Sequence, residues 1–229
     1  ELPPRRDDQP VEVVILSDQG PAVTFPVGAR FHDFRIEARY DDGFTRMVTK
    51  KATMTTDAGF SGAPVSFSEG RMIGVRPGKT VVHADFDGVP TKEGLQVTVT
   101  ADVDLDKIRL EPAPLSILPG ETVTMDAEGL KNDKSIGIIT GLGDLAWKSD
   151  NETAVGVNGP AITGLKLGLG NVTARLGAVT SEPAAVSVVD SIDALLAVDQ
   201  EAIQMRVGES RRIGSDLIIR RGDTDFSRQ

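Results

Sequence analysis

The sequence contains no cysteine, only two histidines, and aromatic residues at just 4% of its 229 positions. Without cysteine the chain has no disulfide, no thiol nucleophile and no thiolate-bound zinc. No apolar run approaches the roughly 20 residues that a membrane-spanning helix needs. Basic residues number 25 against 34 acidic ones, for a net charge of −9, and no basic stripe with interleaved aromatics occurs. The composition therefore argues against a nucleic-acid partner and against a membrane span in this segment.

Glycine and proline are abundant by contrast, with 24 and 13 residues. They separate short segments rich in Val, Thr and Ile in which apolar and polar residues alternate, such as residues 34–40 ("FRIEARY") and 79–86 ("KTVVHADF"). Alternation with a period of two between turn residues is typical of half-buried strands. The sequence therefore predicts an all-β protein.

The chain also repeats itself. Residues 74–100 align on residues 164–190 without a gap, at an offset of 90 (164 − 74), so that Gly74 meets Gly164 and Val99 meets Val189. A period this long indicates a string of small domains, because solenoid repeats are commonly about 20–50 residues. About 90 residues with six or seven short strands suit a two-sheet sandwich.

The repeat divides the chain into four parts. We expect an N-terminal tail over residues 1–10, complete domains over residues 11–101 and 102–190, and a partial third repeat over residues 191–229. Half a sandwich leaves one apolar sheet face uncovered, so we expect this sequence to be a piece of a longer chain.

The order of segments within each repeat resembles the group 2 bacterial immunoglobulin-like domain, found in tandem in invasin- and intimin-type surface proteins. The matching features include a Gly after the first core strand (Gly28 and Gly120), a Trp-x-Ser strand at Trp147, and a closing Val-Thr-Val strand. The first repeat departs from the pattern, with Met54 where the family usually has tryptophan. The resemblance implies tandem immunoglobulin-like β-sandwiches. It also implies a non-catalytic spacer or adhesion module, secreted or on a bacterial cell surface, next to other domains of a longer chain.

The alternation predicts which side chains form the core, and it directs Trp147 toward the core of the second repeat. The expected core residues are Val27, Phe34, Ile36, Ala38, Val82, Ala84, Val97, Val99, Val123, Met125, Trp147, Val172 and Val188.

Stretches that imitate catalytic motifs lack their partners. Ser149-Asp150-Asn151 also occurs in penicillin-recognising serine enzymes, but no serine of this chain has lysine three positions later. Residues 74–80 ("GVRPGKT") imitate a phosphate-binding loop with one residue too few between the glycines, and an alternating strand follows where that loop requires a helix. The sequence predicts no catalytic residue, no bound cofactor and no enzyme activity.

Three acidic residues lie where the first repeat passes into the second: Asp102, Asp104 and Asp106. In a strand their carboxylates would share one face and could hold Ca²⁺ at the domain junction. The alternative is a solvated edge strand whose charges discourage aggregation, and we favour this alternative.

Two further places could bind a partner. Arg221-Gly222-Asp223 forms a triplet known as an integrin-recognition signal. Such a triplet arises by chance in roughly one chain of this length in eight, and we favour the alternative that it is an Arg-rich strand entering a Gly-Asp turn. Tyr40 and Phe44, beside an Asp-Gly turn, could stack on a sugar. The sequence thus predicts an unknown surface protein or a glycan as partner. The main alternative function is a carbohydrate-binding accessory region of a larger secreted polysaccharide-acting enzyme.

Overall fold

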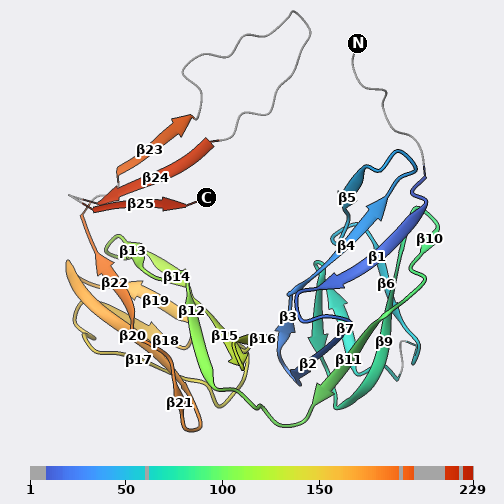
Figure 1. The fold of residues 1–229 in the computed structure, drawn as a ribbon. Helices are drawn as coiled ribbons and strands as arrows, with labels where there is room; N and C mark the ends of the chain where they lie inside the picture. Colours follow the sequence, from blue (N-terminus) through green and yellow to red (C-terminus); the bar gives the residue numbers. More distant parts are fainter. Residues whose placement is uncertain (1–8, 60–61, 191–192, 199–214, 222–223, 229) are drawn as a thin grey trace, which may run out of the picture. The chain divides into compact units, whose positions relative to one another are not determined.

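The computed structural model describes residues 9–59, 62–190, 193–198, 215–221 and 224–228 (Figure 1). Within these ranges every regular element is a strand. The chain is all-β, and its several packed sheets form tandem immunoglobulin-like sandwiches, as the sequence predicted.

Contacts between Cα atoms divide the chain into two compact units. Unit 1 comprises Glu1–Pro112, Met125–Trp147 and Thr173–Glu182, and unit 2 comprises Ala113–Thr124, Lys148–Val172 and Pro183–Gln229. This division does not coincide with the predicted boundary after residue 101, because β12, β15 and β16 belong to the same sheet as β3, β8 and β7. The domain boundaries therefore stay a prediction.

Unit 1 contains three sheets. Their orders are β1-β4-β5, then β10-β9-β11-β2 with β6 also paired to β9, and β12-β15-β16-β3-β8-β7. The bounds are β1 (Glu12–Ser17), β2 (Ala22–Pro26), β3 (Arg30–Phe31), β4 (Phe34–Arg39), β5 (Thr45–Met47), β6 (Thr53–Thr56), β7 (Val65–Ser68), β8 (Arg71–Gly74), β9 (Gly78–Phe86), β10 (Val89–Pro90), β11 (Leu95–Thr100), β12 (Lys107–Glu111), β15 (Asp126–Lys131) and β16 (Lys134–Ile138).

Three phenylalanines from three strands of unit 1 stack in its core. The ring centroids of Phe25 and Phe31 lie 5.0 Å apart with the planes 7° from parallel, and Phe34 stacks on Phe31 at 6.4 Å. Phe25 and Phe31 are fully buried. Burying a side chain of this size stabilises a fold by about 1.5–3 kcal/mol, so the stack is a main source of stability in unit 1.

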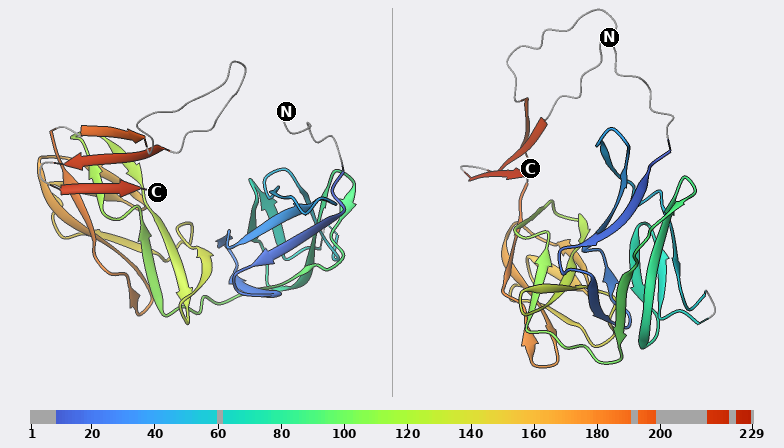
Figure 2. Two further views of the ribbon diagram at one scale, coloured as in Figure 1. Left: turned by 45° about the horizontal axis from the view of Figure 1, so that its top comes forward. Right: turned by 45° about the vertical axis from the view of Figure 1, so that its right-hand side comes forward.

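The remaining strands form three further sheets, ordered β13-β22-β20-β17 with β21 paired to β20, β14-β19-β18, and β23-β24-β25. Their bounds are β13 (Leu115–Ile117), β14 (Thr122–Thr124), β17 (Ala146–Ser149), β18 (Val155–Asn158), β19 (Ala161–Gly164), β20 (Gly168–Leu176), β21 (Val179–Thr180), β22 (Ala184–Val188), β23 (Asp193–Val198), β24 (Ser215–Arg221) and β25 (Thr224–Arg228). The last three strands, in the predicted third repeat, pair antiparallel. Figure 2 draws them in orange and red, with neighbouring arrows pointing in opposite directions.

The core of unit 2 lies between its first two sheets. Ile117, Val155, Ile162 and Val186 are fully buried. Gly164 lies where an added Cβ would meet the side chains of Val188 and Ile117, so β19 of one sheet packs directly on strands of the other.

Several hydrogen bonds of the first predicted repeat recur at equivalent positions of the second. The N–H of Gly28 donates to the carbonyl of Gly74 at 2.8 Å, and the N–H of Gly120 donates to that of Gly164 at 2.7 Å. Other bonds recur in the same way. The N–H of Ile36 donates to the hydroxyl of Thr49, and the N–H of Ala127 donates to that of Thr140. The N–H of Ala84 donates to the hydroxyl of Thr91, and the N–H of Ala174 donates to that of Ser181.

The ungapped alignment of the repeats is wrong in the last strand. Gly78 pairs with Val99, whereas the equivalent Gly168 pairs with Val188 and not with Val189. Val188 is accordingly buried. The second repeat is therefore one residue shorter before β22, and a shift of one residue exchanges the two faces of a strand.

The predicted core is found with three exceptions. Val27, Val123 and Trp147 are only partly buried, and the other predicted core residues are buried. Trp147 lies on β17, the last strand in its sheet order, and Ser149, two residues later on the same face, is the buried residue of this strand. The expectation that Trp147 is a core residue was thus wrong, because an edge strand covers only part of so large a side chain.

Candidate functional site

The hairpin between β4 and β5 holds the two aromatic residues that could bind a glycan. Tyr40 is buried, at 8% exposure, whereas Phe44 is 52% exposed. Their ring centroids lie 5.9 Å apart at an angle of 46°. The turn is closed by the N–H of Tyr40 donating to the carbonyl of Phe44, and Gly43 takes a φ of 82°. Only Phe44 presents its ring to a ligand, so glycan binding at this hairpin stays a prediction. A glycan array with wild-type chain and Phe44→Ala would test it.

The acidic segment before β12 is not a strand. Residues 101–106 have no strand pairing, and β12 begins at Lys107. The Nζ of Lys131 donates to an oxygen of Asp104 at 2.6 Å and to one of Asp106 at 3.0 Å. The carbonyl of Asp102 accepts from the hydroxyl of Thr100 at 2.8 Å. Asp104 and Asp106 therefore lie on either side of one lysine ammonium, and the carboxylate of Asp102 is not part of this group.

The β15–β16 hairpin brings Lys131 to these carboxylates. Its two turn residues, Asn132 and Asp133, have positive φ values of 50° and 59°, as a type I′ turn requires. The N–H of Asn132 donates to the second oxygen of Asp106 at 2.9 Å. This backbone bond and the Lys131 ammonium lower the pKa of Asp106, and the two aspartates raise the pKa of Lys131, Asp104 foremost.

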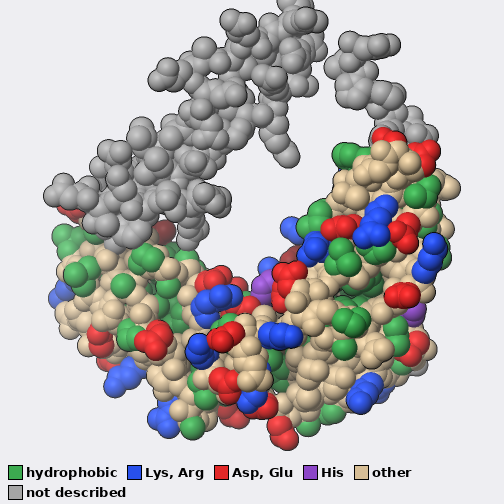
Figure 3. Space-filling view, viewed as in Figure 1, with side chains coloured by type: hydrophobic (Ala, Val, Ile, Leu, Met, Phe, Trp, Pro, Cys, Tyr) green, Lys and Arg blue, Asp and Glu red, His purple; other side chains and the backbone are tan. Residues whose placement is uncertain are grey.

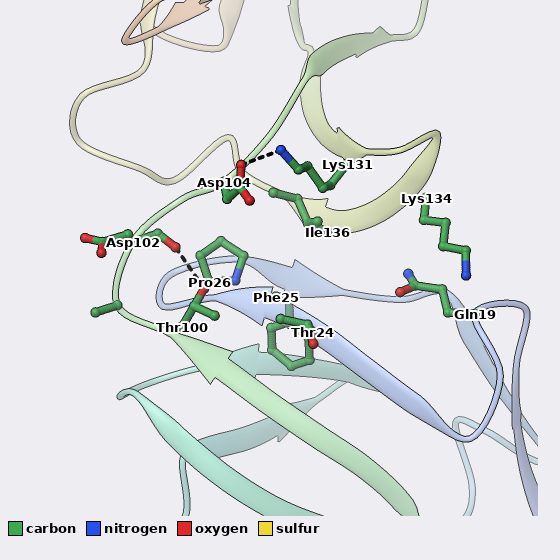
Figure 4. A pocket seen from close by; sticks show the side chains of 11 residues that line it. Gln19, Thr24, Phe25, Pro26, Thr100, Asp102, Asp104, Lys131, Lys134 and Ile136 are labelled. Carbon is green, nitrogen blue, oxygen red and sulfur yellow. Dashed lines mark hydrogen bonds and ion pairs between the residues drawn. The ribbon is translucent and has the colours of Figure 1, made fainter.

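Figure 4 shows Asp104 directed at Lys131, and both residues line one pocket. Every residue that lines this pocket belongs to unit 1. Among the described residues, no group of three or more His, Asp or Glu side chains is placed to hold a metal ion. Calcium binding by Asp102, Asp104 and Asp106 has no support in this arrangement and stays an untested prediction.

The Arg-Gly-Asp triplet falls largely outside the described residues. Arg221 is the last residue of β24 and pairs with Thr224, the first of β25. Gly222 and Asp223 are not among the described residues. Integrin-type recognition at this triplet therefore stays a prediction.

The triplet Ser149-Asp150-Asn151 is a brace that fastens the end of β17 to β20. Asp150 accepts a hydrogen bond from the N–H of Asn171 at 2.6 Å and from its side-chain amide at 2.8 Å. Both bonds favour the ionised carboxylate and lower the pKa of Asp150. Asn151 donates its amide to the carbonyl of Leu169 at 2.8 Å. The aspartate and the asparagine are thus engaged in local structure.

The first repeat contains the same brace, which the sequence reading missed. Asp57 accepts from the N–H of Val81 at 3.0 Å and from the hydroxyl of Thr80, and both bonds lower its pKa, the hydroxyl more. Asp57 and Asp150 lie 93 residues apart (150 − 57), whereas Val81 and Asn171 lie 90 apart (171 − 81). The changing offset concealed the pair. Met54 takes the place of Trp147 at the same spacing of 93, and carrying that spacing three residues further would have revealed the pair.

Charged side chains of both signs are intermixed on the surface. On the face in Figure 3, Lys and Arg lie among Asp and Glu and do not gather in a patch of their own. On β1 and β4, Arg39 pairs with Glu12 at 2.9 Å and Arg35 with Glu37 at 3.0 Å. Exposed pairs of this kind add little stability. In the described part of the chain, no helix has the length and apolar character needed to cross a membrane.

Comparison with known proteins gives distant structural likenesses only. No family model matches the chain, and no curated protein does. Domains 5–6 of the S-layer protein SbsC are 18% identical at a TM-score of 0.36, over 80% of this chain and 99% of that one. The tandem Ig repeats of Dlar are 16% identical at a TM-score of 0.27, over 80% and 99%. Human protocadherin-24 EC1-2 is 16% identical at 0.28, over 80% and 99%. At these values the likenesses carry no conclusion about function.

Proposed function

We propose that this chain is a non-catalytic spacer or adhesion segment of a secreted or surface-exposed bacterial protein, built from group 2 immunoglobulin-like domains. The observation that carries the proposal is a parallel strand pair in each repeat. β2 runs parallel to β11, with Val23 opposite Val97, and β13 runs parallel to β22, with Leu115 opposite Val186. The strand near the start of a repeat and the strand that closes it thus point the same way.

This strand arrangement suits a spacer. Because the two strands are parallel, the chain enters each repeat at one end of the pair and leaves at the other, so every repeat adds length. The repeated hydrogen bonds support the same role, since each of them joins two residues of the same repeat.

Single-molecule stretching of the whole chain between two handles tests the proposal. We expect two separate unfolding events, each releasing about 300 Å of chain, from roughly 90 residues at 3.3–3.6 Å per residue. The variant Ile162→Ala should lower the force of one event and leave the other unchanged, since Ile162 is fully buried in the second repeat. A single event of about twice that length, or extension without resistance, would rule out independent load-bearing repeats.

A further inference from the structure

Residues 101–106 connect β11 to β12, and both parts of this connection are fastened. At its start, the hydroxyl of Thr100, the last residue of β11, holds the carbonyl of Asp102. At its end, the N–H of Asp106 donates to the carbonyl of Leu130 at 2.8 Å. Val103 lies between the two fastened parts.

We propose that Lys131 is the built-in counter-ion of this connection. Its ammonium fastens Asp104 and Asp106 to the β15–β16 hairpin and so holds the end of the connection against that hairpin. The proposal deepens the proposed spacer function and rests on it for its purpose, since a connection that is held in place lets a spacer keep its reach. The fastening itself is local to unit 1 and is testable without any assumption about function.

The geometry favours Lys131 over other cations of the same region. Its side chain is 35% exposed, compared with 67% for Lys107, which pairs with Asp133 instead. A partly covered stem has already lost some rotamer freedom, so holding its ammonium costs less entropy. Two carboxylates share the one ammonium, and the backbone bond from Asn132 holds one of them in place.

An ammonium also suits these oxygens better than calcium. A lysine ammonium has three donors, and two of them reach Asp104 and Asp106. Calcium requires six to eight oxygens at about 2.3–2.6 Å. The second oxygen of Asp106 is already engaged by the N–H of Asn132, and the carboxylate of Asp102 is not part of the group that Lys131 binds.

Hydrogen exchange of two backbone amides, read by NMR on the whole chain, tests the proposal. The N–H groups of Asp106 and Asn132 report the fastening directly, because their acceptors lie across the contact. In Lys131→Met, which keeps a long apolar stem, both amides should exchange about tenfold faster or more. The control Lys134→Met changes the other lysine of the same hairpin, for which no ion pair is found among the described residues, and should leave both rates within about twofold.

Added salt and added calcium test the proposal in two further ways. At about 1 M salt, which weakens ion pairs between exposed side chains, exchange in the wild-type chain should accelerate, and Lys131→Met should respond less. Calcium at matched ionic strength should leave the wild-type rates unchanged. Unchanged rates in Lys131→Met, an equal salt response of both chains, or protection of the wild-type amides by calcium would each overturn the proposal. If Lys131→Met fails to fold, the salt and calcium arms on the wild-type chain decide.

The outcome is separable from that of the stretching experiment. Two unfolding events in a chain whose amides ignore Lys131 would leave the spacer function standing and remove the counter-ion. Faster exchange in Lys131→Met without two unfolding events would do the reverse.

Discussion

The first and second repeats agree in how they close and differ in what they present to solvent. Both place a glycine N–H against the carbonyl of a second glycine, and both hold a strand end with an aspartate, Asp57 in the first and Asp150 in the second. Their hairpins differ: one carries Phe44 at 52% exposure, and the other carries Lys131 beside the acidic connection. The glycine and aspartate hydrogen bonds are thus repeated, whereas the side chains at the hairpin turns differ between the two repeats.

A second difference lies in the loop before β9 and β20 and at the second residue of each of these strands. The first repeat has Val75 there at 48% exposure, followed by Pro77 and Lys79. The second has leucines at all three equivalent positions, Leu165, Leu167 and Leu169, with exposures of 49%, 60% and 72%. Exposed leucines add nothing to the core, so these three positions can vary between the repeats without changing the fold.

Truncating one equivalent core residue in each repeat gives the largest expected effect. Met72 and Ile162 lie 90 residues apart (162 − 72), and both are fully buried. Met72→Ala and Ile162→Ala should each destabilise their own repeat by about 2–5 kcal/mol, measured by chemical denaturation. Leu169→Ala, at an exposed position, should change stability by less than about 0.5 kcal/mol. If either core variant weakened both repeats equally, the repeats would not be independent.

The paired glycines are the next most sensitive positions. A Cβ on Gly74 would lie 2.5 Å from the carbonyl oxygen of Pro26, and one on Gly164 would lie 2.5 Å from that of Leu118. Because backbone must move in both cases, Gly74→Ala and Gly164→Ala should each cost about 1–3 kcal/mol. Gly141→Ala, where a Cβ meets nothing within 4 Å, is the matched control and should be neutral. A neutral Gly164→Ala beside a costly Gly74→Ala would show that the second repeat closes differently.

Trp147 and Met54 give a finer comparison, because they occupy equivalent strands. Trp147→Ala should cost about 1–2 kcal/mol, less than the 3–5 kcal/mol typical of a fully buried tryptophan, since its side chain is only partly covered. Met54 is 9% exposed, so Met54→Ala should cost at least as much although its side chain is smaller. Thermal unfolding of the two variants would decide between them. A cost above about 3 kcal/mol for Trp147→Ala would restore it as the main core residue.

The strands and most of the core could be predicted from the sequence, because alternation with a period of two directly marks a half-buried strand. The spacing between the repeats could not. Gly28 and Gly120 lie 92 residues apart (120 − 28), Gly74 and Gly164 lie 90 apart (164 − 74), and Val99 and Val188 lie 89 apart (188 − 99). An insertion in a turn costs little free energy and does not change the alternation within the flanking strands, so the strand pattern does not show where the insertion lies. A fixed offset therefore misplaced Val189.

The acidic connection could not be predicted for a different reason. Asp102, Asp104 and Asp106 alternate in sequence, which suggested a strand, but the partner of two of them, Lys131, lies 25 or more residues away. Nothing local in the sequence marks such a pairing. It depends on the turn at Asn132 and Asp133, whose positive φ values place the hairpin against the connection.

The two aspartate braces predict how stability depends on pH. Hydrogen bonds to Asp57 and Asp150 lower the pKa of both carboxyls in the folded chain below the ordinary value of 3.8. A lowered folded-state pKa means that folding favours the ionised form. Its contribution is therefore complete above the unfolded pKa and is lost as the pH falls through the folded one.

Calorimetric melting temperatures should accordingly fall as the pH drops below 3.8, and the double variant Asp57→Asn, Asp150→Asn should show a shallower fall. Asp106, whose pKa is lowered as well, keeps part of the slope in that variant. Each single variant should remove a comparable part, because the two braces use equivalent strand ends. A large effect of Asp57→Asn and none of Asp150→Asn would mean that the two aspartates make equivalent hydrogen bonds but that only those of Asp57 contribute to the stability.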